Sequence, residues 1–282
     1  MEIKNVTIIG GGTMGNGIAH IFAWKGFNVN LVEISEPLYL RAFTTISQNL
    51  DRQVKKATIT EIDKNAILNR INKIISIENI PLNSDLIIEA IFENKEAKCA
   101  IFNKLDKIIK PDSIFASNTS SISITELAAS CRPDRFIGMH FMNPVPIMKL
   151  IEIIRGYSTS DDTFITIEKV SKELDKVPVE VFDYPGFISN RILLPMINEA
   201  IFALMEGVGS KEDIDKVMIL GMNHPMGPLA LADFIGLDVC LAIMEVLYNG
   251  YNDSKYRPCP LLKKMVAANK LGNKTGEGFY KY

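Results

Sequence analysis

The chain has 282 residues, of which 47% are hydrophobic and 23% charged, a composition typical of a globular protein long enough for two domains. Its 31 basic and 33 acidic side chains give a formal net charge of −2, so no overall field favours nucleic acid or anionic lipid. Four cysteines without metal-ligand spacing indicate neither a disulfide scaffold nor a metal site, and they fit a reducing compartment. We therefore expect small-molecule partners, no nucleic acid, no membrane and a cytoplasmic location.

The beginning of the chain, MEIKNVTIIG, leads directly into a strand pattern. It has none of the basic, apolar and small-residue segments that make up a signal peptide. The most apolar long stretch, residues 186–205, contains Asn190, Arg191, Asn198 and Glu199, which are too polar for a lipid-spanning helix. We expect a buried helix of the folded protein there.

Up to about residue 183, short β-branched runs alternate with longer segments of helical period. We predict strands at 6–10, 28–33, 85–90, 113–118, 136–141, 149–155 and 177–182, and helices at 14–26, 37–57, 94–109 and 161–175. This alternation predicts an α/β fold, a doubly wound and mostly parallel sheet with helices on both faces.

After Pro185 and Gly186 the strand patterns stop. The remaining pattern is helical, so we predict two domains, 1–184 and 185–282, the second all-helical. The helical segments are 190–207, 211–221, 227–248 and 259–270. Residues 186–205 and 227–248 are apolar around more of their circumference than one small domain can cover, which predicts a homodimer through the second domain.

Three glycines follow the first predicted strand with the spacing Gly10-x-Gly12-x-x-Gly15 and open a helix. Gly10 would allow a sharp turn, Gly12 would let a pyrophosphate approach the main chain, and Gly15 would let helix and strand pack closely. The amides at the start of the helix, around Thr13 and Met14, would bind the anion. The alternative is a glycine-rich turn without a ligand.

Glu33 ends the second predicted strand, eighteen residues after Gly15. A carboxylate at this place binds the hydroxyls of an adenosine ribose and repels a 2′-phosphate. Together with the glycines, Glu33 predicts a Rossmann-type domain that binds NAD in preference to NADP.

A nicotinamide enzyme that oxidises an alcohol needs a base and a group that holds the base. His140 ends a predicted strand at the carboxyl edge of the sheet, where such sheets bind ligands. Glu152, on the next strand, lies among apolar residues and would orient the imidazole. The alternative is that Glu152 points to solvent from an edge strand. The other histidines, His20 and His224, fit structural positions better.

The chain resembles the 3-hydroxyacyl-CoA dehydrogenases over essentially its whole length, and in particular the bacterial 3-hydroxybutyryl-CoA dehydrogenases of butyrate metabolism. The blocks that carry the resemblance are IGGGTMGNGIA, IEAIFENKEAK, ASNTSSISIT, GMHFMNPVPIMKLIEII, PGFISNRIL, HPMGPLALADFIGLD and KTGEGFYKY. Several of them are long and chemically unusual. One departure is Glu33, where members of the family often have Asp, although the longer side chain should still reach a ribose.

The resemblance implies that His140 is the catalytic acid and base, that Glu152 is its partner, and that Ser120 and Asn190 bind the substrate oxygens. For binding, it implies that Glu93, Lys98 and Asn143 line the nicotinamide ribose of NAD and that Ser120 also binds the cofactor. It also puts the nucleotide end of CoA near residues 41–57, where Asn49, Arg52 and Lys56 share one helix face.

The implied reaction is reversible hydride transfer between NAD and C3 of an acyl-CoA, which interconverts acetoacetyl-CoA and (S)-3-hydroxybutyryl-CoA. Two alternatives belong to other classes. A dehydrogenase of free β-hydroxy acids has the same two-domain plan, but resembles families with a catalytic lysine where this chain has Asn190. A non-catalytic NAD(H)-binding protein would keep the three glycines and lose the catalytic residues. In this chain the four residues are present: His140, Glu152, Ser120 and Asn190.

Overall fold

The computed structural model describes residues 1–282. They form two compact units, Met1–Asp183 and Tyr184–Tyr282, which are described separately. None of the helices combines the length and the apolar character that a membrane span requires.

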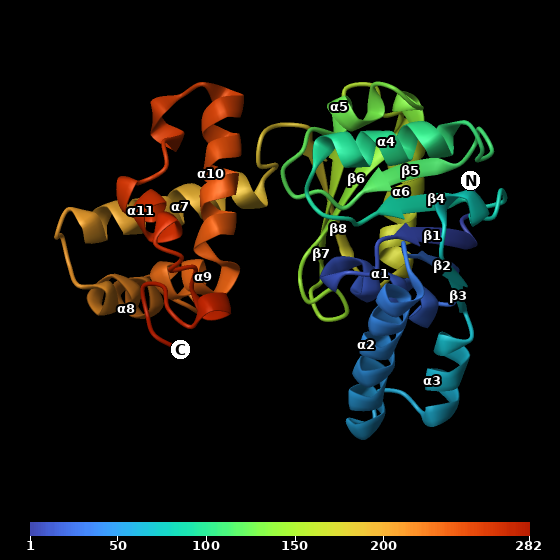
Figure 1. Cartoon of the computed structure of the whole chain (residues 1–282), viewed down its shortest axis with the longest axis horizontal. Coiled ribbons are helices and arrows are strands. Elements are labelled where there is room, and N and C mark those ends of the chain that lie inside the picture. The colour runs from blue at the N-terminus through green and yellow to red at the C-terminus, as the bar shows by residue number, and fades with distance from the viewer. The chain divides into compact units, whose positions relative to one another are not determined.

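The first unit contains one sheet of eight strands in the order β3-β2-β1-β4-β5-β6-β7-β8 (Figure 1). All neighbouring strands are parallel except β6 and β7, which are antiparallel. The predicted Rossmann-type, mostly parallel sheet is thereby confirmed. The strands are β1 (Asn5–Ile9), β2 (Asn28–Val32), β3 (Ile71–Ile74), β4 (Leu86–Glu89), β5 (Ile114–Ser117), β6 (Phe136–Phe141), β7 (Leu150–Arg155) and β8 (Val177–Phe182).

The strand patterns did not predict β3, whose sequence is INKI. It lies at the edge of the sheet, and the side chains of Asn72 and Lys73 are exposed. A short, half-polar edge strand lacks both the continuous apolar run of a buried strand and several cycles of alternation. Central strands such as β1 and β4 are buried along their length because both faces of the sheet are covered.

The helices of the first unit are α1 (Thr13–Trp24), α2 (Glu36–Lys55), α3 (Glu61–Leu68), α4 (Lys95–Asp106), α5 (Ile124–Ala128) and α6 (Asp161–Glu173). Helices α2 and α3 pack against each other and project from the sheet (Figure 1). α3 begins at a capping box, in which Thr60 and Asp63 each bind the other's backbone N–H. This short helix was not among those predicted.

The second unit is all-helical, as predicted. Its helices are α7 (Ser189–Met205), α8 (Lys211–Met222), α9 (Pro228–Ile235), α10 (Leu237–Tyr251) and α11 (Pro260–Ala267). The stretch 227–248 forms two helices and not one, because Gly236, with φ +102°, lies between them in a conformation that side chains disfavour.

The last residues of the chain are held by a buried carboxylate. Asp233 is 1% exposed and accepts hydrogen bonds from the backbone N–H groups of Phe279 (2.9 Å) and Tyr280 (2.8 Å) and from the Tyr282 hydroxyl (3.1 Å). Because these donors are satisfied inside the unit, the tail is fixed against α9.

A second carboxylate, Asp215 of α8, fixes the start of α9. It accepts from the backbone N–H groups of Leu229 and Ala230, at 2.8 and 3.0 Å. These are among the N–H groups that a helix cannot satisfy within itself. The Tyr280 hydroxyl donates to the same carboxylate at 3.0 Å, which links the tail to both helices.

Candidate functional site

The glycine-rich turn between β1 and α1 has the geometry of an anion cradle. Gly10 has φ +94°, and a Cβ there would lie 2.8 Å from the Ala90 carbonyl oxygen. A Cβ on Gly15 would lie 1.7 Å from the Gly10 carbonyl oxygen, so the helix packs directly on the turn. Gly12 faces open space, and α1 begins at Thr13 without a side-chain cap. The amides at this helix start therefore suit a pyrophosphate.

Glu33 directly follows β2 and lies beside this turn. Its carboxylate accepts from the backbone N–H of Gly11 (2.6 Å) and from that of Ile34 (3.1 Å). A cavity of about 290 Å³ adjoins it, lined mainly by isoleucines and also by Gly10, Glu33, Ser76, Glu78 and Lys104. An apolar slot next to a fixed carboxylate fits the adenosine end of a dinucleotide.

A second cavity, of about 400 Å³, begins at the glycine-rich turn. We call it the turn cavity. Its walls are the turn with the start of α1, one face of α2, and the loop that joins β6 to β7. They are lined by Gly11, Gly12, Thr13, Asn16, Gly17, Arg41, Ala42, Thr45, Asn49, Asn143, Pro144, Val145 and Pro146. The structure thus brings the predicted binding residues Asn49 and Asn143 to the same cavity as the glycines.

The other two residues of the predicted CoA face do not line the turn cavity. Arg52 donates to the Asn49 side chain at 2.9 Å. Lys56 caps the carboxyl end of α2 and is exposed. Basic side chains are favoured at the carboxyl end of a helix by the helix dipole itself.

His140 of β6 and Glu152 of β7 lie directly opposite each other in the antiparallel pair, so their side chains share one face of the sheet. The distance between His140 Nδ1 and Glu152 Oε2 is 2.7 Å. His140 is 8% and Glu152 2% exposed, so Glu152 does not point to solvent. A carboxylate on Nδ1 fixes the ring and its tautomer, and the proton chemistry then falls to Nε2.

A charged cluster lies at the carboxyl end of β4, which β5 separates from β6 in the sheet, and the sequence analysis missed its buried central residue, Glu89. Glu89 accepts from Lys98 Nζ (2.7 Å), the Ser117 hydroxyl (2.6 Å) and the Ile91 N–H (2.7 Å). Burial raises the pKa of Glu89, against the lowering effect of Lys98. The signal that selected His140, a polar residue ending a buried strand at this edge, also applies to Glu89.

Glu93, which is more exposed, joins this cluster to the hydroxyl-bearing turn after β5. Glu93 pairs with Lys98 at 3.1 Å and accepts from the Thr119 hydroxyl at 2.5 Å and from the Ser120 N–H at 2.9 Å. Burial acts to raise the pKa of Glu93, but the Lys98 charge and these hydrogen bonds outweigh it, so the pKa is lowered. The structure thus joins Glu93, Lys98 and Ser120.

Asn190 belongs to the second unit, where it lies in the first turn of α7 and is partly buried. The other candidate site residues, including Met14 at the start of α1, belong to the first unit.

Two family models match the chain. Residues 5–184 match the 3-hydroxyacyl-CoA dehydrogenase NAD-binding domain, and residues 186–282 match the 3-hydroxyacyl-CoA dehydrogenase C-terminal domain. The chain is 53% identical to a probable 3-hydroxybutyryl-CoA dehydrogenase of Bacillus subtilis, over 100% of this chain and 98% of that protein. It is 54% identical to a 3-hydroxybutyryl-CoA dehydrogenase of Bradyrhizobium diazoefficiens, over 99% and 96% of the two chains. The crystal structure of (S)-3-hydroxybutyryl-CoA dehydrogenase PaaH1 from Ralstonia eutropha superposes with a TM-score of 0.97 at 52% identity, covering 100% of this chain and 99% of that chain.

Proposed function

Because the chain belongs to the 3-hydroxyacyl-CoA dehydrogenase family, we propose that it is an NAD-dependent 3-hydroxybutyryl-CoA dehydrogenase, which interconverts acetoacetyl-CoA and (S)-3-hydroxybutyryl-CoA. This reaction would serve butyrate or fatty acid metabolism. The observation that carries the proposal is the buried pair of His140 and Glu152, with 2.7 Å between the imidazole Nδ1 and the carboxylate, at the edge of the sheet where Rossmann-type domains bind their ligands.

The residues around the glycine-rich turn fit NAD. The open side of Gly12 accommodates the pyrophosphate, and Glu33 would bind the adenosine ribose. Glu93 and Lys98 would line the nicotinamide ribose, together with Ser120 and Asn143. When bound, NAD supplies the hydride acceptor or donor at C4 of its nicotinamide.

His140 would move the proton of the reaction. During reduction of acetoacetyl-CoA its Nε2 gives a proton to the oxygen on C3, and during oxidation it takes that proton back. Glu152 would hold the ring through Nδ1 and stabilise the charged imidazolium. Ser120 and Asn190 would donate hydrogen bonds to the substrate oxygens. Asn49, Arg52 and Lys56 would face the nucleotide end of CoA.

The test is the consumption of NADH on addition of acetoacetyl-CoA, followed at 340 nm. We expect turnover with this substrate and none with free acetoacetate, since the proposal requires the CoA thioester. Turnover of the free acid alone would indicate a β-hydroxy acid dehydrogenase, and NADH binding without turnover of either would indicate a non-catalytic protein. A series of 3-ketoacyl-CoA substrates would test the four-carbon preference that we expect.

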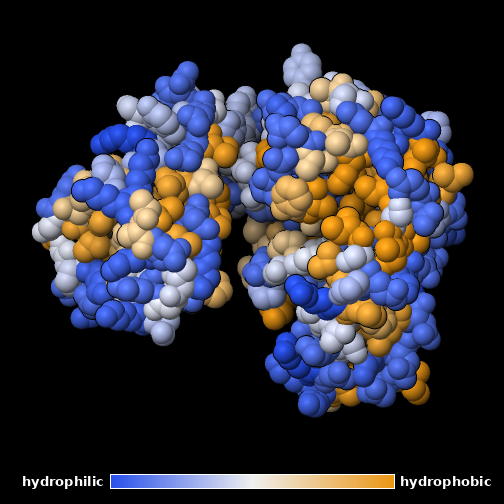
Figure 2. Space-filling model, in the orientation of Figure 1, coloured by the Kyte–Doolittle hydropathy of each residue, from blue (hydrophilic) through white to orange (hydrophobic).

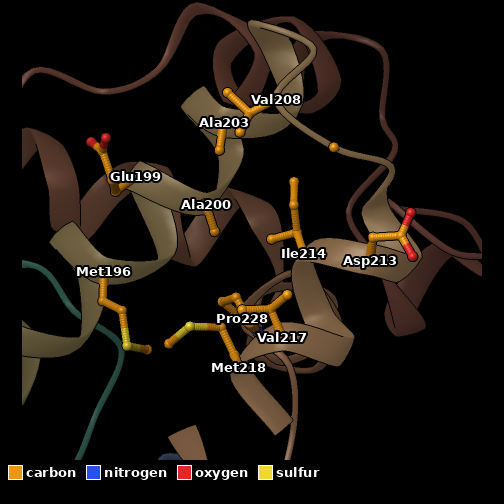
Figure 3. Close-up of a pocket in the computed structure, with 11 residues that line it drawn as sticks. Met196, Glu199, Ala200, Ala203, Val208, Asp213, Ile214, Val217, Met218 and Pro228 are labelled. Carbon is orange, nitrogen blue, oxygen red and sulfur yellow. The ribbon is translucent and has the colours of Figure 1, made fainter. Parts of the chain in front are cut away.

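We also propose that the protein forms a homodimer through the helical unit. Hydrophobic residues gather on the visible face of this unit in the region of α7 and α8 (Figure 2). A groove of about 490 Å³ lies there. Its floor is apolar, with Met196 and Met218 pointing toward each other and Glu199 and Asp213 pointing outward at the rim (Figure 3). An apolar floor with a charged rim is typical of a protein interface.

The exposed apolar side chains at this groove favour a second copy as the occupant. Val208 is 75% and Val217 59% exposed at the groove, and Leu220 of the same helix as Val217 is 77% exposed. We expect a dimeric mass by light scattering at micromolar concentration. Val217→Glu should shift the mass toward the monomer, whereas Leu82→Glu, at an exposed leucine of the first unit, should not. A monomeric mass for the unmodified protein would overturn this proposal.

A further inference from the structure

Lys176 is a buried cation that the proposed reaction does not use. It lies between α6 and β8 and is 6% exposed. Its ammonium donates hydrogen bonds to the carbonyl oxygens of Val145 (2.5 Å) and Met148 (2.6 Å). No carboxylate lies within ion-pair distance of it, and that of the adjacent Asp175 pairs with Lys25. A buried charge is costly unless it makes specific contacts, and the contacts of Lys176 are two backbone carbonyls.

Both carbonyls belong to the loop of residues 142–149, which joins β6 to β7 and which we call the β6–β7 loop. Within the loop, the Pro144 carbonyl accepts from the N–H groups of Ile147 and Met148, each at 3.0 Å. The loop begins two residues after His140 and ends three residues before Glu152. One ammonium therefore ties together the two halves of the connection between the strands of the candidate catalytic pair.

The opposite side of this loop packs on the cofactor-binding turn. Val145 is buried, and a Cβ on Gly17 of α1 would lie 2.9 Å from the Cβ of Val145, so the loop and helix are in direct contact. Asn143 and Pro144 line the turn cavity together with Gly12. The Val145 carbonyl is held by Lys176, while its side chain touches the helix that begins at the glycines.

We propose that Lys176 is a positioning residue for ligand binding, which holds the β6–β7 loop, and through it Asn143, against the glycine-rich turn. This inference rests on the proposed function, because it takes the turn cavity to be part of the NAD site. The facing positions of His140 and Glu152 are set by the strand pairing, and the two hydrogen bonds of Lys176 are to the loop. Loss of the ammonium should therefore weaken NADH binding more than it slows the chemical step.

The charge environment of Lys176 adds a pH dependence. Burial, together with the smaller effects of the Lys149 and Lys25 charges and against the opposing effect of Asp175, lowers the pKa of Lys176 to about 8. Above about pH 8 the amine loses its charge, and hydrogen bonds to the carbonyls weaken because they are no longer charge-assisted. The Kd of the unmodified protein for NADH should therefore rise between pH 7 and pH 9.5.

The experiment compares Lys176→Met with Lys172→Met, whose lysine lies in the last turn of α6, is exposed and pairs with Glu168. NADH affinity is measured by nicotinamide fluorescence, kcat at saturating NADH and acetoacetyl-CoA, and melting temperature on the same samples. We expect Lys176→Met to raise the Kd for NADH about tenfold, to change kcat less than threefold, and to remove the rise in Kd above pH 8. Lys172→Met should leave all of these unchanged.

A purely structural role for Lys176 predicts a lower melting temperature with unchanged Kd, kcat and pH dependence in the folded variant, and this result would overturn the inference. If Lys176→Met does not fold, the decision rests on the pH titration of the unmodified protein and on Lys176→Gln, whose amide keeps N–H donors but carries no charge. A Kd for NADH that changes less than twofold in Lys176→Gln, and also less than twofold between pH 7 and pH 9.5 in the unmodified protein, then counts against the proposal. If the unmodified protein fails to bind NADH or to reduce acetoacetyl-CoA, the proposed function itself is wrong.

Discussion

Two buried carboxylates of the helical unit and two of the sheet unit differ in their partners. In the helical unit, Asp215 and Asp233 accept mainly from backbone N–H groups and tyrosine hydroxyls. In the sheet unit, Glu89 and Glu152 face side chains that carry or exchange a proton, Lys98 and His140. A backbone N–H group that donates to a carboxylate fixes the chain at that point and has no further polar atom that could contact a ligand. A titratable partner has further polar atoms, which are oriented by the carboxylate. We infer that the first type stabilises the fold and the second orients a site.

The largest effect that this comparison predicts is at the His140 and Glu152 pair. His140→Gln should lower kcat by ~10²- to 10⁴-fold, the usual contribution of a general acid and base, with NADH affinity nearly intact. Glu152→Gln should lower kcat by a smaller factor, because a neutral amide cannot stabilise the imidazolium. The double variant should be far from additive, as for groups that act as a unit.

Measurements of kcat, NADH affinity and melting temperature on these three variants separate the two types of carboxylate. If Glu152 were of the structural type, Glu152→Gln would lose melting temperature and cofactor affinity and keep its kcat. Full activity of folded His140→Gln protein would end the proposed mechanism.

His20 is a buried side chain with neither type of partner. It is 0% exposed, and neither ring nitrogen forms a hydrogen bond of normal geometry. Burial lowers the pKa of His20 to about 4 from 6.5, against a smaller opposing effect of Gln53. As pH falls from 6.5 to 4, the unfolded chain binds a proton that the folded one does not. The free energy of unfolding should therefore fall by up to about 3 kcal/mol as the pH goes from 6.5 to 4, with no further loss from His20 below pH 4.

Urea unfolding at pH 7, 5.5 and 4 measures this loss. His20→Phe should flatten the pH dependence, whereas His224→Gln, at a partly exposed histidine, should leave it as it is. An equally steep acid loss in His20→Phe would assign it to other groups.

Asp233 tests the structural type of carboxylate directly. In Asp233→Asn an NH2 group, which cannot accept a hydrogen bond, replaces one of the two accepting oxygens. The loss should lower the free energy of unfolding by ~1–3 kcal/mol. The melting temperature of the helical unit should fall, and kcat of the folded enzyme should change little. Glu212→Gln, an exposed change in the first turn of α8, serves as the control. A drop in kcat without a drop in stability would contradict the assignment of Asp233 to the fold.

Glu33 is intermediate, since its carboxylate holds two backbone N–H groups and lies beside a cavity. We predict that NADH is used better than NADPH, because the carboxylate repels a 2′-phosphate. Glu33→Ser should narrow the ratio of the two kcat/KM values by about tenfold, an order-of-magnitude figure for one charge–charge contact near a surface. Glu36→Gln, in the first turn of α2 and paired with Lys73, should keep the ratio. Equal use of both cofactors by the unmodified enzyme would refute the argument.

The smallest effect is expected at Lys56, an exposed charge at the end of α2. If CoA phosphates lie near it, Lys56→Glu should raise KM for acetoacetyl-CoA a few-fold, more at low salt, with kcat unchanged. Lys107→Glu, at the exposed end of α4, is the matched control. The same KM for acetoacetyl-CoA in both variants at low salt would mean that Lys56 is a solvated surface charge that does not contact CoA.

Sequence patterns predicted those parts of the fold and site whose signal is local. The glycine-rich turn and the buried strands could be predicted because each depends on residues close together in the chain. Gly236 was not recognised as a helix break, since one glycine within an apolar periodic stretch is also tolerated inside a helix. The contact between Lys176 and the β6–β7 loop was beyond prediction, because a lysine next to Asp175 looks like any exposed lysine until residues 145 and 176 are brought together by the sheet.

The antiparallel direction of β7 makes the catalytic pair a local feature of the chain. β7 starts at the edge where β6 ends, so a short loop is enough to connect the two strands. His140 and Glu152 therefore meet at a separation of only twelve residues in the sequence. Side chains alternate between the two faces of a strand. Inserting or deleting one residue within either strand would therefore send one partner to the opposite face, whereas a change of length in the connecting loop need not. For enzyme engineering this means that changes within residues 136–155 must keep the parity of both strands, and that the connecting loop tolerates only changes that preserve its contacts with Lys176 and α1.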